Sequence, residues 1–250
     1  MIDIKRANKA FDEYVKKYDP QNLKILLKIN HIKRVSEISR RYATELGLGQ
    51  EDIELAELIG LLHDIGRFEQ IKLYGDCSDV KTGVDHADQS CIYLFDEGHI
   101  KDFYDKEDYY QIIKDSIKNH NKYVIDNEIK DKSLFFTKMI RDIDKIDIFQ
   151  VLSENYTYVF DKNEISEHVL DAFNQKLTLD SHLKQSKTDA IYSYFAFLYD
   201  INFKESFEIL KDYKSLDHLC SIITPKDDSI IEYNELKNKM YLYIEERLRN

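Results

Sequence analysis

The scarcity of glycine and proline constrains the fold of this chain more than any other feature. Only seven glycines and two prolines stand among 250 residues. Strand-rich folds need many turns, and turns use these two residues heavily, so their scarcity favours long helices with few breaks. A hydrophobic content of 43% is enough for a substantial core at this length. We therefore expect an all-α fold.

Apolar spacing indicates where the helices of the first part of the chain lie. Residues 19–49 repeat apolar side chains at helical intervals, with Asp19 and Pro20 at the start and two glycines at the stop. Residues 50–66 form a second helix that is acidic in its first turn, as the helix dipole favours. Further helices are expected over residues 84–95, 106–121 and 132–156, and a loop over residues 69–83.

Composition also limits the partners and the compartment of the protein. A formal net charge of −11 argues against an extended nucleic-acid footprint, which is normally basic. The three cysteines show no CxxC spacing, so we expect reduced thiols rather than disulfides or a zinc–thiolate site. The N-terminus has charges throughout, and no apolar run approaches the ~20 residues of a membrane span. We expect a soluble, cytoplasmic protein without a membrane partner.

Each of the five expected helices brings a metal-type ligand onto or beside its apolar face. Taken singly, each of these side chains is more often an ordinary surface or hydrogen-bonded residue than a ligand. Taken together they favour a shared site, and nitrogen and oxygen ligands suit divalent iron, manganese, nickel, cobalt or zinc. The set comprises His31, His63, Asp64, His86, His120, Asp142, Asp144 and Asp147.

The order of these residues resembles the HD-domain superfamily of metal-dependent phosphohydrolases. That superfamily is marked by a histidine on one helix, a His-Asp doublet on the next and a later aspartate. Here His31 comes first, "LLHDIGRF" carries the doublet His63-Asp64, and "RDIDKID" carries Asp144. The last aspartate of the family usually precedes a lysine, so Asp144 matches better than Asp142, although Ile143 replaces the usual small residue.

The resemblance covers residues 22–150 and implies a bundle of about five core helices. We therefore expect a single all-helical domain over residues 1–250. Its HD catalytic core would span residues 22–150, and residues 151–250 would form a C-terminal helical extension. The tyrosine- and phenylalanine-rich helices of this extension resemble plain core more than an interface, although a homodimer is possible.

The resemblance also implies a ligand set for one or two divalent ions. The first ion would be held by His31, His63, Asp64 and Asp144. Two-metal branches of the family carry extra histidines between the doublet and the last aspartate, and His86 and His120 occupy that interval. Asp64 would then bridge the two ions with a water or hydroxide. Iron, manganese, nickel, cobalt or zinc would suit the site, with magnesium possible at the second position; His99, in an apparent turn, is left out.

The chemistry implied by this site is hydrolysis by a metal-activated water. Asp64 would be central to it, and the substrate anion would need a cation nearby. Arg67 is the best candidate because a guanidinium holds phosphate through two hydrogen bonds, although a salt bridge to Asp64 or Glu69 is an equal alternative. Lys145, beside Asp144, is a weaker candidate. Surface charge is the preferred interpretation of Lys118 and Lys122.

The function expected from the sequence is cleavage of a phosphoester or phosphoanhydride in a nucleotide or similar small phosphate. Two alternatives stay open on the same residues. One is a di-iron oxygenase built on the same scaffold, because the ligand types alone do not separate it from a hydrolase. The other is a non-catalytic helical protein that senses a nucleotide.

Overall fold

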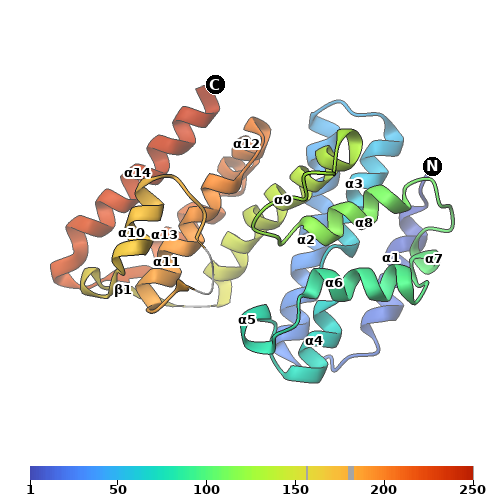
Figure 1. The fold of residues 1–250 in the computed structure, drawn as a ribbon, viewed down its shortest axis with the longest axis horizontal. Helices are drawn as coiled ribbons and strands as arrows, with labels where there is room; N and C mark the ends of the chain where they lie inside the picture. Colours follow the sequence, from blue (N-terminus) through green and yellow to red (C-terminus); the bar gives the residue numbers. More distant parts are fainter. Residues whose placement is uncertain (156, 180–182, 250) are drawn as a thin grey trace. The chain divides into compact units, whose positions relative to one another are not determined.

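The computed structural model describes residues 1–155, 157–179 and 183–249, and these residues are mostly helical. This confirms the expected all-α class. The chain divides into two compact units, residues 1–144 and residues 145–250, and the long helix α9 (Asp131–Asn155) carries the chain from the first unit into the second (Figure 1). Tyr156, the last residue of the helix expected over residues 132–156, lies outside the described residues.

The first unit is organised around α2 (Leu23–Glu45) and α3 (Gln50–Leu62), which pack side by side (Figure 1). The buried face of α2 carries the expected apolar row, from Ile25 to Tyr42. The two helices approach closely at Gly60, where an added Cβ would lie 2.8 Å from the Cα of Ser36. A side chain at position 60 would therefore force the helices apart.

The segment between α3 and the next long helices differs from the expectation. The loop expected over residues 69–83 is wrong in its first half, because α4 (Arg67–Tyr74) continues the helical path and buries Phe68 and Ile71. Gly75, at φ +67°, ends α4, since this left-handed conformation favours glycine.

The sequence interpretation missed the first helix, α1 (Ile4–Val15). The other helices of the first unit are α5 (Asp79–Thr82), α6 (His86–Cys91) with a π-helical turn (Ile92–Asp96), α7 (Ile100–Phe103) and α8 (Tyr110–Asn119).

The second unit is also helical, with one short parallel strand pair. Tyr158 pairs with Ile223 and Phe160 with Pro225 in this pair. Asp189 is buried and accepts hydrogen bonds from the backbone nitrogens of Ser166 and Gln185, so it ties two segments together. The elements after α9 are β1 (Tyr158–Phe160), α10 (Glu167–Asn174), α11 (Lys187–Phe195), α12 (Lys204–Tyr213), α13 (Ser215–Ile222), β2 (Ile223–Pro225) and α14 (Ile230–Arg249), with short 3₁₀ turns at Lys162–Glu164, Ala196–Asp200 and Asp227–Ser229.

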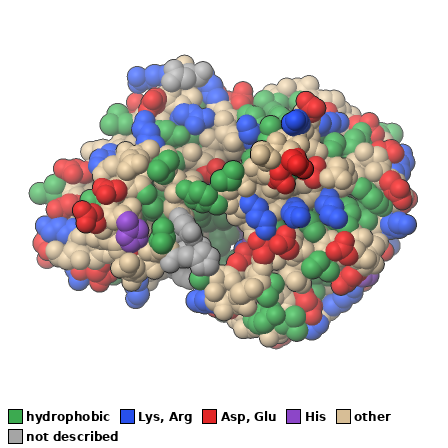
Figure 2. Space-filling model, viewed as in Figure 1, with side chains coloured by type: hydrophobic (Ala, Val, Ile, Leu, Met, Phe, Trp, Pro, Cys, Tyr) green, Lys and Arg blue, Asp and Glu red, His purple; other side chains and the backbone are tan. Residues whose placement is uncertain are grey.

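The surface of the protein carries both signs of charge. Acidic and basic side chains lie intermixed on the face drawn in Figure 2. Many form exposed ion pairs, such as Lys16 with Glu13, and pairs of this kind add little to stability. Within the described part of the chain, no helix has the length and the apolar character that a membrane crossing requires. All three cysteines are free.

Candidate metal centre

Four of the expected ligands converge in the first unit, although α3 ends at Leu62 and not at the expected residue 66, so His63 and Asp64 directly follow the helix. His31 lies in α2, and His63 is the C-cap of α3, directly before Asp64. The Nε2 atom of His31 lies 3.3 Å from Nε2 of His63 and 3.5 Å from Oδ2 of Asp64. Asp144, on α9, places its Oδ1 atom 3.1 Å from Nε2 of His31 and 3.6 Å from Nε2 of His63. These four side chains surround one point from three helices and the turn after α3.

The other two expected ligands form a second group at the other carboxylate oxygen of Asp64. His86 is the first residue of α6, and His120 is the C-cap of α8. Their Nε2 atoms lie 3.0 Å apart. Oδ1 of Asp64 lies 3.1 Å from Nε2 of His86 and 3.7 Å from Nε2 of His120. Within each of the triplets His31–His63–Asp64 and Asp64–His86–His120, the potential ligand atoms lie within 4.8 Å of one another.

Asp64 therefore faces both groups, with a different oxygen toward each. Its Oδ2 atom faces His31, and its Oδ1 atom faces His86 and His120. A carboxylate that presents one oxygen to each of two ligand groups has the arrangement required to bridge two cations. Of the six converging residues, all except Asp144 are at most 2% exposed, so the site is screened from bulk water and its electrostatic interactions are strong.

The imidazole rings of His63 and His120 are oriented by their own helices. The Nδ1 atom of His63 lies 2.8 Å from the carbonyl oxygen of Gly60, and Nδ1 of His120 lies 2.7 Å from that of Ile117. A carbonyl only accepts, so each Nδ1 carries a proton, and in the neutral ring each Nε2 presents a lone pair to the site. Histidines that bind metals are held in this way by an acceptor on the far nitrogen.

Burial and charge keep the carboxylates and His120 in the forms that bind metals. Burial raises the pKa of Asp64, but the charges of Lys28, His86 and Arg67 outweigh it and hold that pKa well below the usual range. Burial raises the pKa of Asp144 as well, but its hydrogen bonds with His31 and His63 outweigh burial and hold that pKa well below the usual range. Burial lowers the pKa of His120 to about 4. At neutral pH the site therefore holds two carboxylates and a neutral His120 ring.

The structure adds one cation that the sequence interpretation missed. Lys28 lies three residues before His31 on α2, and its Nζ atom is 2.6 Å from Oδ2 of Asp64. Its side chain is 13% exposed, and that of Asp144 is 14% exposed, so the site reaches solvent on the side of these two residues. The spacing of three residues, which places two side chains on one helix face, was the available signal.

The cations expected from the sequence are engaged with other partners. The Nη1 atom of Arg67 binds Asp79 at 2.6 Å, and its Nε atom lies 3.5 Å from Oδ1 of Asp64, so the salt-bridge alternative for Arg67 applies in this structure. Lys145, in the second unit, binds Asp200 at 2.8 Å. Lys122 binds Asp85 at 2.5 Å.

The other polar residues considered in the sequence lie outside this group. Lys118 is exposed, as expected for a surface charge. His99 stacks on Tyr93 with its ring centroid 4.3 Å away and bonds Asp102 at 3.1 Å. Asp142 is fully buried on α9, but the aspartate of that helix that meets His31 and His63 is Asp144.

A tight backbone contact joins the two halves of the site. The turn after Asp64 passes α6 at Gly66, where an added Cβ would lie 2.5 Å from the carbonyl oxygen of His86. The Oγ atom of Ser90 accepts from the nitrogen of Gly66 at 2.9 Å and donates to the carbonyl of His86 at 2.9 Å. The position of His86 therefore depends on a glycine in the turn that carries Asp64.

Comparison with known proteins identifies the domain that carries these residues. Residues 29–150 match the family model described as the HD domain, and this segment contains all six converging residues. Searches of curated proteins and of solved structures returned no match. Residues 29–150 of this chain therefore form an HD domain, the domain that defines the HD-domain superfamily.

Proposed function

We propose that this protein hydrolyses a small phosphoester or phosphoanhydride, such as that of a nucleotide, with two divalent ions that share Asp64. His31, His63 and Asp144 would complete the first position, and His86 and His120 the second. The proposal depends most on the acceptors gathered at the second position. The Nε2 atoms of His86 and His120 and Oδ1 of Asp64 lie 3.0–3.7 Å apart.

When both rings are neutral, these three atoms repel one another unless a cation lies among them. The Nδ1 atoms of His86 and His120 both face oxygen acceptors, Oδ2 of Asp79 and the carbonyl of Ile117. In the neutral rings both Nε2 atoms are therefore lone-pair donors to the site, as is the ionised Asp64. Burial makes such an unrelieved group of acceptors costly. The donor chemistry thus fits a divalent metal ion.

Bound divalent ions would supply Lewis acidity, which lowers the pKa of a coordinated water and offsets charge on phosphoryl oxygens. The protein supplies the rest of the chemistry. Asp64 fixes the spacing between the two positions, and buried walls exclude bulk water. Lys28 lies at the solvent side of the site, where its ammonium can meet a substrate phosphate once metal ions share the charge of Asp64. A cation at this half-buried position suits an anionic substrate.

The test is metal analysis of anaerobically purified protein, followed by hydrolysis assays. Nucleotides and p-nitrophenyl phosphate would be screened with Mn²⁺, Ni²⁺, Co²⁺ and Fe²⁺. We expect His63→Ala and Asp64→Asn to abolish both metal binding and hydrolysis. His99→Ala is the matched control, because His99 is a histidine of the same unit outside the site, and it should retain both.

These assays also distinguish hydrolysis from the two alternative functions of the same residues, oxygenase chemistry and nucleotide sensing. Phosphoester hydrolysis at the wild-type rate in Asp64→Asn would contradict the proposal. Oxygen uptake with a mixed-valent di-iron EPR signal would replace it with oxygenase chemistry. Tight nucleotide binding with metal present and no turnover would indicate a sensor.

A further inference from the structure

His86 obtains its hydrogen-bond acceptor in a different way from His63 and His120. His63 and His120 each close a helix, where backbone carbonyls of the last turn have no partner within the helix. Each ring uses the carbonyl three residues earlier, that of Gly60 or Ile117. These two rings are therefore fixed by the helix that carries them.

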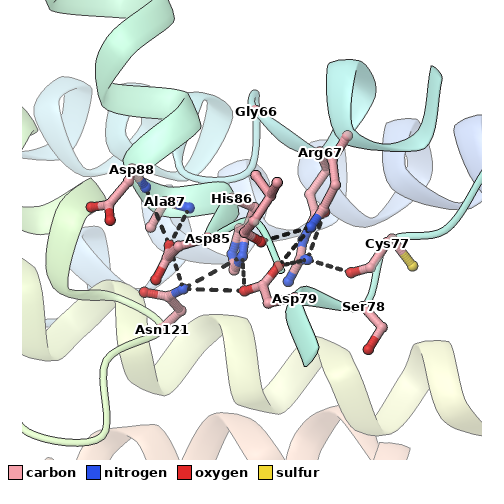
Figure 3. Close-up of polar contacts among 12 residues, drawn as sticks. Gly66, Arg67, Cys77, Ser78, Asp79, Asp85, His86, Ala87, Asp88 and Asn121 are labelled. Atoms are coloured by element: carbon pink, nitrogen blue, oxygen red, sulfur yellow. Dashed lines mark hydrogen bonds and ion pairs between the residues drawn. The ribbon is translucent and has the colours of Figure 1, made fainter. Parts of the chain in front are cut away.

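His86 opens its helix, and the free backbone groups at that end are N–H donors rather than acceptors. An acceptor for its Nδ1 atom must come from elsewhere in the chain. Asp79 provides it, with Oδ2 at 2.6 Å from Nδ1 of His86 (Figure 3). The ring that completes the second metal position is thus held from outside its own helix.

Asp79 connects His86 to further residues around the site. Its Oδ1 atom accepts from Nη1 of Arg67 at 2.6 Å and from Nε2 of Gln70 at 2.9 Å. On the other side, the Nδ2 atom of Asn121 reaches Oδ2 of Asp79 at 3.5 Å (Figure 3). Burial raises the pKa of Asp79, but the hydrogen bond and charge of His86 and the charge of Arg67 outweigh it, so the carboxylate stays ionised at neutral pH.

Asp79 is the first residue of the short helix α5, which lies within a loop, residues 75–83, bounded by two glycines in the left-handed conformation. Gly75 has φ +67° and Gly83 has φ +69°. Gln70, which is 2% exposed, closes this loop, because its Nε2 atom donates to Asp79, to Oγ1 of Thr82 at 2.9 Å and to the carbonyl of Val84 at 3.0 Å. Arg67 adds a contact to the carbonyl of Cys77.

We propose that Asp79 is a positioning residue for His86, so that the second metal position forms only when the loop of residues 75–83 is closed on Gln70. The first metal position does not use this loop, since His63 is oriented by α3 itself. The inference rests on the proposed two-ion site. It adds that the two positions, although they share Asp64, hold their remaining histidines through different parts of the chain.

The experiment compares Asp79→Ala with the wild type by titration with Mn²⁺ and by NMR of the metal-free protein. We expect affinity for the second ion to fall about 10- to 100-fold, as for other partners of metal-bound histidines, with the first ion unaffected. Two-bond ¹H–¹⁵N spectra of the imidazoles should show the proton of His86 on Nδ1 in the wild type and moved toward Nε2 in the variant.

Three further variants complete the design. Asp79→Asn keeps an oxygen that can accept from Nδ1 and should recover part of the affinity. Gln70→Ala opens the loop without removing the carboxylate and should weaken the second ion as well, which keeps the test available if Asp79→Ala does not fold. Asp76→Asn is the matched control, because Asp76 lies in the same loop and pairs with Lys24 and Lys81.

The NMR measurement separates failure of this inference from failure of the proposed function. A wild-type protein that binds fewer than two ions would remove the two-ion site, while the tautomer of His86 would still report on Asp79. An unchanged tautomer in Asp79→Ala would overturn the positioning role. Equal loss of affinity for both ions in a folded variant would also overturn it, because a general structural role predicts that result.

Discussion

Gly66→Ala is the sharpest test of how the two halves of the site are joined. The backbone of Gly66 has φ −68° and ψ −19°, a conformation that alanine adopts without strain, so the effect of the substitution is purely steric. The new Cβ would lie 2.5 Å from the carbonyl oxygen of His86 and 2.6 Å from the nitrogen of Ser90. Both atoms belong to the backbone of α6, so no side-chain rotation relieves the contact.

The size of the effect follows from these distances. The carbonyl of His86 would have to retreat by about 1 Å to reach ordinary van der Waals contact. Overpacking of this kind costs about 1–3 kcal/mol, and we expect the upper half of that range because α6 must move as a unit. For a unit of this size the melting temperature should fall by roughly 5–10 °C. His86 would move away from Oδ1 of Asp64, now 3.1 Å distant.

The assay is thermal unfolding together with Mn²⁺ titration of the variant. Gly60→Ala serves as a contrast, because its Cβ meets the backbone of Ser36 and would disturb α2 against α3 instead of α6. Gly49→Ala is the control, since nothing lies within 4 Å of its Cβ, and its cost as an N-cap change should stay below about 1 kcal/mol. If Gly66→Ala has the melting temperature of the wild type and binds two ions as tightly as the wild type does, the contact between Gly66 and α6 is not as close as the structure indicates.

Three other changes probe separate features of the molecule. Lys28→Met should raise KM for a phosphate substrate about 10- to 100-fold, because a hydrogen bond to a charged group is worth about 1.5–3 kcal/mol, and an unchanged KM in steady-state kinetics would exclude the contact. In metal-free protein, stability should fall as pH drops from about 6.5 to 4, because the unfolded chain protonates His120 in this window whereas the folded chain, with its pKa at about 4, does not. This group alone should cost about 3 kcal/mol, and urea unfolding of His120→Gln should show a shallower pH slope. Asp189→Asn should destabilise the second unit by about 1.5–3 kcal/mol, measured by thermal unfolding, because its carboxylate accepts at 2.9 Å or less from Ser166 and Gln185.

The helices of the first unit were predictable wherever apolar periodicity was strong. The expected helix over residues 132–156 matches α9 closely, and that over residues 19–49 contains α2. The error over residues 69–83 has a clear cause. Charged and glycine residues suggested a loop there, but burial of Phe68 and Ile71 keeps the chain helical as far as Gly75. Tertiary packing outweighed local composition.

The candidate ligands were predictable for a different reason. A metal site needs imidazole or carboxylate side chains, and these are rare on apolar helix faces, so the sequence itself marks His31, His63 and the aspartates of residues 142–147. The choice of Asp144 among these aspartates came from the resemblance to the HD-domain superfamily. Lys28 was harder to recognise, because lysine is common on exposed helix faces. Only the position of Asp64 in space shows that this lysine points into the site.

The groups that orient the ligands leave a much weaker trace in the sequence. Every residue has a backbone carbonyl, so the acceptors at Gly60 and Ile117 are not marked by residue type. They are implied by geometry alone, since a histidine at the end of a helix has free carbonyls within reach. The same reasoning shows that a histidine at the start of a helix lacks such an acceptor. His86 in "VDHADQS" therefore already required a partner from another segment, and the structure identifies that partner as Asp79.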